Sequence, residues 1–240
     1  MNLLDHISYA SSANNLVCEN GITTYLSNDF REMKACYKEA RPNDPLQQIF
    51  DPDKTDIGAH DGFWLKGVDE DGQVVQLQAM RRFDLGEQTL AQHAKEWASA
   101  YLPPTIDREK IDLSTSIFDA APIMTEIKGR VVYHGGFWLH KSKRGGGLTG
   151  IFPRLLMNIA VQTFAPDFIY GYQARETAYN GLGAKEGYRC YDELAIRWGL
   201  KNGGYFDKAI VWVEKKDFER MMAYQPRETF DTMEAMRRPL

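Results

Sequence analysis

Phe137-Trp-Leu-His-Lys-Ser-Lys-Arg-Gly-Gly-Gly-Leu-Thr-Gly150 is the stretch of sequence that decides the fold. A β-prone run ends at His140, a glycine-rich turn follows, and the Ile, Leu and Met residues of 150–164 predict a helix. Such a turn brings several backbone N–H groups together at a helix start, where the helix dipole adds partial positive charge. The stretch therefore predicts a phosphate site. The alternative is a tight turn that uses glycine only for its backbone freedom.

Two common phosphate motifs compete for this turn. A Walker loop needs Lys and then Ser or Thr after its last glycine, whereas Ile151 and Phe152 stand there, which excludes it. Gly145, Gly147 and Gly150 satisfy the dinucleotide pattern GxGxxG after a strand. A dinucleotide fold needs further alternating strands and helices, but the fewer than 100 residues that remain predict a short helix and antiparallel strands. The sequence therefore disfavours a dinucleotide site.

The turn resembles the pyrophosphate-binding motif of the GNAT superfamily of acyl-CoA N-acyltransferases, Arg/Gln-x-x-Gly-x-Gly/Ala. Arg144 and Gly147 match this motif, and Thr149 stands where Gly or Ala is usual. Downstream, Leu182-Gly-Ala-Lys-Glu-Gly-Tyr188 resembles the later family motif Leu-Tyr-x-Lys-x-Gly-Phe. The two motifs occur in the family's order and spacing, and the resemblance covers about 60 residues, 131–191.

The resemblance implies acetyl-CoA or another acyl-CoA as co-substrate, with no metal. In this family the fourth and fifth strands separate, admit the pantetheine arm and place the thioester near the strand break. The acyl group passes directly to a small-molecule or peptide amine, and a homodimer is compatible with the family. The residues expected to bind coenzyme A are Leu139, His140, Lys143, Arg144, Gly145, Gly146, Gly147, Leu148, Thr149 and Gly150.

Direct attack by an amine on a thioester needs a base, and the leaving thiolate benefits from an acid. His134 and His140 are candidates, since residues two apart share a face of a strand, here together with Trp138. His134 is further from the turn and so is better placed for the acceptor. Its alternative role is a hydrogen-bonded packing residue. Glu126 is a carboxylate alternative.

The resemblance also exposes a departure from the family. Gly183 stands where many members have a tyrosine that protonates the coenzyme A thiolate. Tyr179, about one turn earlier on the same expected helix, is the substitute that we predict for this acid, with packing as its alternative role.

The remaining pattern predicts an α/β (α+β) fold, a GNAT-like mixed and mostly antiparallel central sheet flanked by helices. We expect one domain, residues 1–240, with a helical insertion at 86–130, between the third and fourth strands, that contributes to the acceptor site. The segment 105–128 predicts a lid, a loop or a short helix. The expected strands are 21–27, 63–68, 74–83, 131–140, 168–172, 194–198 and 209–213, and the expected helices follow Asn28 and cover 87–102, 150–164, 176–185 and 217–222.

Composition and charge limit the other classes of function. A net charge of −4 gives no reason to expect general nucleic-acid binding, and the basic cluster Lys141, Lys143 and Arg144 suits a small polyphosphate. No apolar run is long enough to span a bilayer, and the first 15 residues lack the pattern of a secretory signal, so we expect a cytoplasmic protein. Three widely separated cysteines indicate reduced thiols rather than disulfides or a zinc site.

Two alternative functions stay open. Residues 51–82 resemble the acyl-homoserine-lactone and N-acyl amino acid synthases, although Glu126-Ile-Lys-Gly-Arg130 is one residue longer than their Glu-x-x-Arg-Phe motif. The second alternative is a non-catalytic acyl-CoA-binding protein, suggested by Gly183 and the lack of a clear base.

Overall fold

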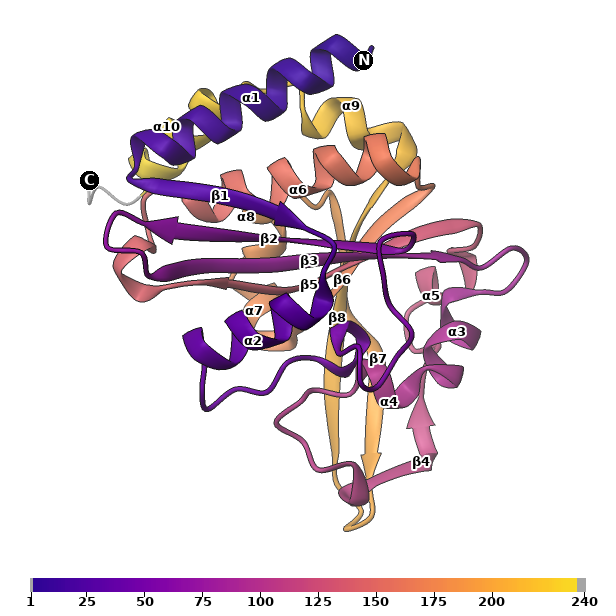
Figure 1. The fold of residues 1–240 in the computed structure, drawn as a ribbon. Coiled ribbons are helices and arrows are strands. Elements are labelled where there is room, and N and C mark those ends of the chain that lie inside the picture. Colours follow the sequence, from indigo (N-terminus) through magenta and orange to yellow (C-terminus); the bar gives the residue numbers. More distant parts are fainter. Residues whose placement is uncertain (1, 237–240) are drawn as a thin grey trace.

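A computed structural model describes residues 2–236 of the 240-residue chain. Its eight strands form one sheet in the order β1-β2-β3-β5-β6-β8-β7-β4 (Figure 1). Only β5 and β6 run parallel, and every other neighbouring pair is antiparallel. The strands are β1 Ile22–Ser27, β2 Gly62–Asp69, β3 Val74–Asp84, β4 Ile111–Ile117, β5 Arg130–Leu139, β6 Phe168–Ala174, β7 Cys190–Leu200 and β8 Tyr205–Glu214. The predicted mixed, mostly antiparallel sheet is confirmed.

Helices cover both faces of the sheet, and each face has its own apolar core. Above the sheet in Figure 1 lie α1, α6, α9 and α10, and below it lie α2 to α5. None of the described helices is long and apolar enough to cross a membrane. The helices are α1 Leu3–Glu19, α2 Phe30–Ala40, α3 Leu90–Glu96, α4 Ala98–Tyr101, α5 Ile123–Glu126, α6 Leu148–Phe164, α7 Arg175–Tyr179, α8 Leu182–Glu186, α9 Phe218–Met221 and α10 Pro226–Ala235, with short 3₁₀ turns at Gln48–Phe50, Arg108–Lys110, Lys141–Lys143 and Lys215–Asp217.

The parallel pair β5 and β6 is short. Their register covers only Val131 to Tyr133 of β5 opposite Phe168 to Tyr170 of β6. Beyond these residues β5 continues beside β3, and β6 continues beside β8. The two strands therefore part in the middle of the sheet, which is the separation that the family resemblance implied.

A β-bulge in β5 changes which side chains share a face. Leu77 and Ala79 of β3 pair with Trp138 and Gly135, so one residue of β3 lies opposite two residues of β5. Gly136, one of the two, has φ +63°, which suits glycine. His134 therefore faces α6, whereas Trp138 packs on the opposite core. The prediction that His134 shares a face with Trp138 and His140 is wrong, because the extra residue reverses the alternation.

The segment between β3 and β5 is only partly helical. It contains α3, α4 and α5, but it also contributes β4, which extends the sheet beyond β7. The prediction of a lid, a loop or a short helix here missed β4, although Ile111, Leu113 and Ile117 alternate with polar residues. Its pairing is long-range and irregular, and the Ser116 hydroxyl accepts a hydrogen bond from the Gly199 N–H in place of a regular strand contact.

A buried arginine fixes the loop before β2 onto the sheet. Arg81 is 2% exposed, and its guanidinium lies 3.2 Å from the Asp61 carboxylate. It also donates to the Ile49 carbonyl and to the Thr55 hydroxyl, both at 2.7 Å. This loop follows the residues that line one side of the central cavity, so Arg81 helps to position that side.

We expect Arg81→Met to lower the free energy of unfolding by about 3–5 kcal/mol, because it leaves the Asp61 carboxylate without its buried partner. Arg82→Met is the matched control. Arg82 is partly exposed and pairs with the exposed Asp84, so its loss should cost less than about 1 kcal/mol. Urea denaturation measures both variants, and equal losses would contradict a special role for Arg81.

Candidate active site

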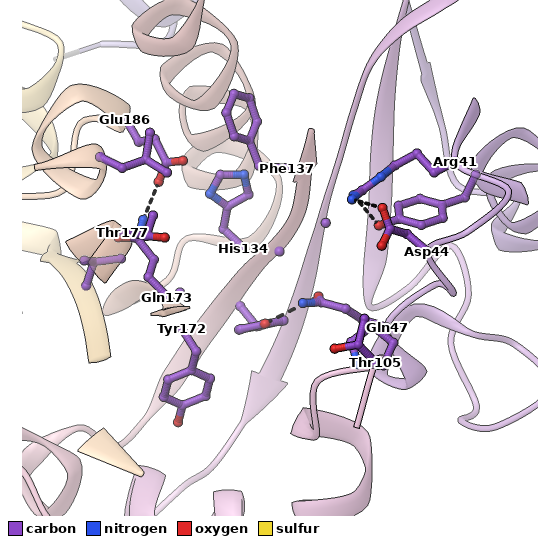
Figure 2. A pocket seen from close by; sticks show the side chains of 18 of the residues that line it. Arg41, Asp44, Gln47, Thr105, His134, Phe137, Tyr172, Gln173, Thr177 and Glu186 are labelled. Carbon is purple, nitrogen blue, oxygen red and sulfur yellow. Dashed lines mark hydrogen bonds and ion pairs between the residues drawn. The ribbon is translucent and has the colours of Figure 1, made fainter. Parts of the chain in front are cut away.

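A cavity of about 300 Å³ lies where β5 and β6 part (Figure 2). Polar side chains reach it from both faces of the sheet. On the face of α2 these come from the loop that follows α2, and on the face of α6 they come from β5, β6 and α8. The polar residues that line it include Arg41, Asp44, Gln47, His134, Gln173 and Glu186. The cavity thus connects the two faces through the gap between the strands.

His134 stands in a directed chain of hydrogen bonds. The Gln78 amide nitrogen donates to the Phe152 carbonyl at 2.8 Å, so the Gln78 oxygen faces His134 Nε2, at 3.1 Å. His134 must therefore carry its proton on Nε2. Its Nδ1 then accepts from the Tyr188 hydroxyl, at 2.8 Å. The network selects one tautomer and orients the Tyr188 hydroxyl.

Burial keeps both members of this pair neutral. It lowers the pKa of His134 to about 3 and raises the pKa of Tyr188 well above its usual value near 10. Because both ring nitrogens already have partners, His134 is arranged to hold Tyr188 in place. The histidine predicted as a base does line the cavity, but as a neutral, hydrogen-bonded imidazole.

Glu186 is a buried carboxyl group that the sequence did not point to. It is 4% exposed, and its Oε2 accepts a hydrogen bond from the Gln173 side-chain amide at 2.9 Å. Burial raises the pKa of Glu186 to about 8, against smaller opposing effects of Gln173 and Arg154. At neutral pH the group is therefore mainly a carboxylic acid, which can donate a proton. The sequence held one signal for this residue. Glu186 follows Gly183 by three residues, which places both on the same face of one helix.

Several backbone N–H groups of the glycine-rich turn have no partner within residues 2–236. Gly145 and Gly147 have φ values of +89° and +72°, and Gly147 caps α6. The N–H groups of Leu148 and Gly150 donate to carbonyls within the turn. Among the described residues, no acceptor is paired with the backbone N–H groups of Gly145, Gly146, Gly147 and Thr149. Clustered free amides at a helix start form an anion-binding arrangement.

The side chains around the turn are tied to the chain itself. The Arg144 guanidinium donates to the Leu139 carbonyl at 2.7 Å, and the Lys143 ammonium reaches the Asn20 carbonyl at 3.4 Å. His140 begins the 3₁₀ turn, and its Nδ1 lies 2.7 Å from the Ser142 hydroxyl. The predicted coenzyme A residues are thus brought together, and the Lys143 and Arg144 side chains have acceptors within the chain.

Three features follow one another along the chain here. Strand β5 leaves its parallel neighbour β6, a glycine-rich turn ends β5, and the long helix α6 follows the turn. This is the arrangement that the resemblance to the GNAT superfamily predicted. No family model and no curated protein matches the chain.

The solved structures similar to this chain include acetyltransferases. Arabidopsis thaliana NAA60 in complex with acetyl-CoA is 14% identical with a TM-score of 0.47, covering 81% of this chain and 99% of that chain. A variant of the spermidine N-acetyltransferase SpeG from Vibrio cholerae is 9% identical with a TM-score of 0.43, covering 83% and 96%. The aminoglycoside acetyltransferase AAC(6')-Ib in complex with coenzyme A and kanamycin is 13% identical with a TM-score of 0.39, covering 83% and 98%.

Gly183, which stands where the resemblance implies a tyrosine, has no room for a side chain. A Cβ atom added to Gly183 would lie 2.6 Å from Val211 Cγ1. Tyr179, the predicted substitute, is 61% exposed and hydrogen-bonds to Glu193 outside the cavity. Glu126 is exposed on α5 and does not line the cavity either. Of the three predicted catalytic residues, the structure places only His134 at the strand divergence.

The structure offers no metal site among residues 2–236, where no group of three or more His, Cys, Asp or Glu side chains is arranged around one point. Cys18, Cys36 and Cys190 are free thiols.

The C-terminal helix α10 packs against the glycine-rich turn. A Cβ atom added to Gly147 would lie 2.7 Å from the Phe230 ring and 2.9 Å from the Phe230 carbonyl oxygen. A Cβ atom added to Gly150 would likewise lie too close to the Met233 side chain. Gly146 is freer, since the Glu234 carboxylate is its nearest neighbour, at 4.0 Å. Glycine at 147 is therefore demanded by backbone geometry and packing, independently of any ligand.

We expect Gly147→Ala to lower the free energy of unfolding by about 2 kcal/mol or more. The left-handed φ alone costs an alanine roughly 1–2 kcal/mol, and the contact with Phe230 adds to this. Gly146→Ala, one residue earlier in the same turn, should change stability by less than about 1 kcal/mol. Thermal and urea denaturation measure both, and a well-tolerated Gly147→Ala would contradict the packing of α10 on the turn.

The raised pKa of Glu186 makes stability depend on pH. The native state holds this proton up to about pH 8, whereas the unfolded chain releases it near 4.5. The contribution of Glu186 is therefore fully present below pH 4.5 and is lost as the pH rises toward 8, by an amount on the order of a few kcal/mol. Glu186→Gln should remove this dependence. Subtracting the urea unfolding curves of the variant from those of the wild type, between pH 5 and 8.5, isolates it, and a pH-independent difference would contradict the assignment.

Proposed function

We propose that the protein is an acyl-CoA-dependent N-acyltransferase that moves an acyl group, acetyl in the simplest case, from coenzyme A to an amine. The observation that carries the proposal is the cavity between β5 and β6. It is lined by residues from both faces of the sheet and lies beside the middle of β5, the strand that leads into the glycine-rich turn. A long ligand with an anionic end and a reactive thioester end fits these two features together.

The parted strands suit the middle of such a ligand. Past Tyr133, the edge of β5 that faces β6 has no strand partner. Unpaired strand edges bind extended groups that carry amides. The pantetheine arm of coenzyme A has two amide groups in an extended chain. In addition, the enclosed Gln173 Oε1 has no donor among the described residues, so a ligand N–H can satisfy it.

The amides of Gly145, Gly146 and Thr149, which have no partner among the described residues, suit the anionic end, whereas Gly147 is covered by Phe230. They lie at the first turn of α6, a helix of 17 residues, where the helix dipole favours negative charge. In the proposed complex the pyrophosphate binds these amides, so that the pantetheine arm enters the gap between the strands and the thioester reaches the cavity.

The amine enters from the face of α2 in this proposal. Arg41, Asp44 and Gln47 line that side, and Thr105, from the segment predicted to help the acceptor site, lies beside Gln47 in Figure 2. Arg41 and Asp44 form an ion pair, so this side presents both charges to an acceptor. A small-molecule or peptide amine attacks the thioester carbonyl there, and the thiolate departs on the side of α8.

Calorimetry with acetyl-CoA and with free coenzyme A tests the binding step. At a concentration of about 100 times Kd, a ligand specific for the native state should stabilise it by about 2.7 kcal/mol, which raises Tm by several degrees. Both ligands should bind, because the proposed contacts are to the nucleotide and the pantetheine. Absence of binding and of any rise in Tm would refute the proposal.

The reaction itself is followed as release of free thiol from acetyl-CoA in the presence of a panel of small-molecule and peptide amines. Longer acyl donors, tested in parallel, identify the preferred chain. Binding without thiol release for any amine or donor would favour a non-catalytic acyl-CoA-binding protein instead.

A further inference from the structure

The Glu186 carboxyl group is buried without an ion-pair arrangement that would explain its burial. The cation acting on it, Arg154, donates to the carbonyls of Gly150, Lys185 and Ala184 instead. Burying an ionisable group costs free energy unless it is paired, so a buried carboxyl without an ion-pair partner that lines a cavity is a candidate for a functional role. Arg154 itself holds α8 against the first turn of α6, and this contact fixes the backbone that carries Glu186.

The two oxygens of Glu186 have different surroundings. Oε2 is held by the Gln173 amide, whereas Oε1 has no partner among the described residues and is not enclosed by protein. Because Glu186 is 4% exposed and lines the cavity, the opening at Oε1 leads into the cavity. Figure 2 shows Glu186 and Gln173 on the same side of the cavity as His134.

The close packing of α8 on the sheet explains why the Glu186 side chain can reach the cavity. Gly183 and Glu186 are three residues apart and therefore lie on one helix face. Gly183 packs directly on Val211 of β8, which brings α8 close to the sheet. The short distance lets the longer side chain of Glu186, one turn later, extend toward Gln173 and the cavity.

We propose that Glu186 is a catalytic acid, the residue that protonates the sulfur of coenzyme A as it leaves. This inference rests on the proposed acyl transfer. The amine nitrogen forms a bond to the thioester carbonyl carbon, and the C–S bond breaks with its electron pair on sulfur. The proton of Glu186 passes to that sulfur, giving the free thiol and a carboxylate. The carboxylate regains a proton from the one that the acceptor nitrogen releases, carried through solvent.

The other groups around Glu186 are less suited to this step. The Tyr188 hydroxyl already donates to His134, and burial raises its pKa far above that of a thiol. His134 is neutral, and its remaining proton lies on the nitrogen that faces Gln78. Arg154 keeps its protons at neutral pH, and Val211 is apolar. Proton transfer is most effective between groups of similar pKa, and the pKa of Glu186, about 8, is close to that of an ordinary thiol.

The test compares the full-length wild type with Glu186→Gln and Glu186→Asp, using acetyl-CoA and the amine selected by the panel, from pH 6 to 9.5. We expect Glu186→Gln to lower kcat by about 100-fold and to change KM for acetyl-CoA by less than about 3-fold. In the wild type, kcat should fall as the pH rises above about 8, and the variant should lack this descending limb. Glu186→Asp keeps an acidic proton and should restore part of the rate.

The matched control is Glu176→Gln, the same change at an exposed position of α7 outside the cavity. It should retain the wild-type rate and pH profile. Tm values show whether each variant folds. A Glu186→Gln variant with wild-type kcat and an unchanged descending limb would overturn the catalytic role while leaving the acyltransferase function intact. A folded Glu186→Gln variant that loses acetyl-CoA binding, with KM raised in step with the loss of kcat, would make Glu186 a structural residue. Failure of the wild type to release thiol would instead refute the proposed function and this inference with it.

Discussion

The separation of β5 from β6 is the constraint on which the rest of the structure depends. Each strand pairs along its outer edge, β5 with β3 on both sides of the bulge and β6 with β8 throughout, so each follows its own neighbour. They pair with each other only as far as Tyr133 and Tyr170. Since paired strands lie about 4.8 Å apart, a gap between neighbours of one sheet must open once their partners diverge. The cavity occupies that gap. The first turn of α6, which follows β5, and helix α8, which follows β6, are joined by Arg154 beside this gap.

The polar groups around the gap fall into two kinds. One chain of hydrogen bonds begins at a carbonyl of α6, passes through Gln78 and His134, and ends on Tyr188, with every polar atom of the imidazole satisfied. Such a network in a low-dielectric interior fixes side-chain positions and tautomers. The second kind is the pair of Gln173 and Glu186, in which one acceptor of each residue is left over. Satisfied groups build the walls of the cavity, and the unsatisfied ones are available to a ligand.

Local signals were enough to predict most of the sheet, whereas the bulge, β4 and the burial of Glu186 depend on contacts between distant segments; helices α1 and α10 were not predicted although they carry local capping signals. Seven strands and the helix after the turn were placed to within a few residues, because alternation and glycine turns are local. The bulge at Gly136 was not visible, and a single extra residue moved Trp138 to the other face. β4 was missed because its pairing with β7 creates it. Glu186 was missed because its burial depends on how closely α8 approaches Val211.

The glycine-rich turn shows why residue identity and ligand binding need separate arguments. Gly147 has a left-handed backbone and lies against Phe230, so the fold alone would require glycine there. A pattern of glycines therefore carries little information about a phosphate. What distinguishes this turn from a purely structural one is that its amides, from Gly145 to Gly147 and at Thr149, are paired with no other described group at the start of a long helix. In a folded protein, clustered backbone donors of this kind are normally satisfied, by water or by an anion. In the proposed complex the pyrophosphate would therefore bind the amides of Gly145, Gly146 and Thr149, since Phe230 of α10 covers Gly147.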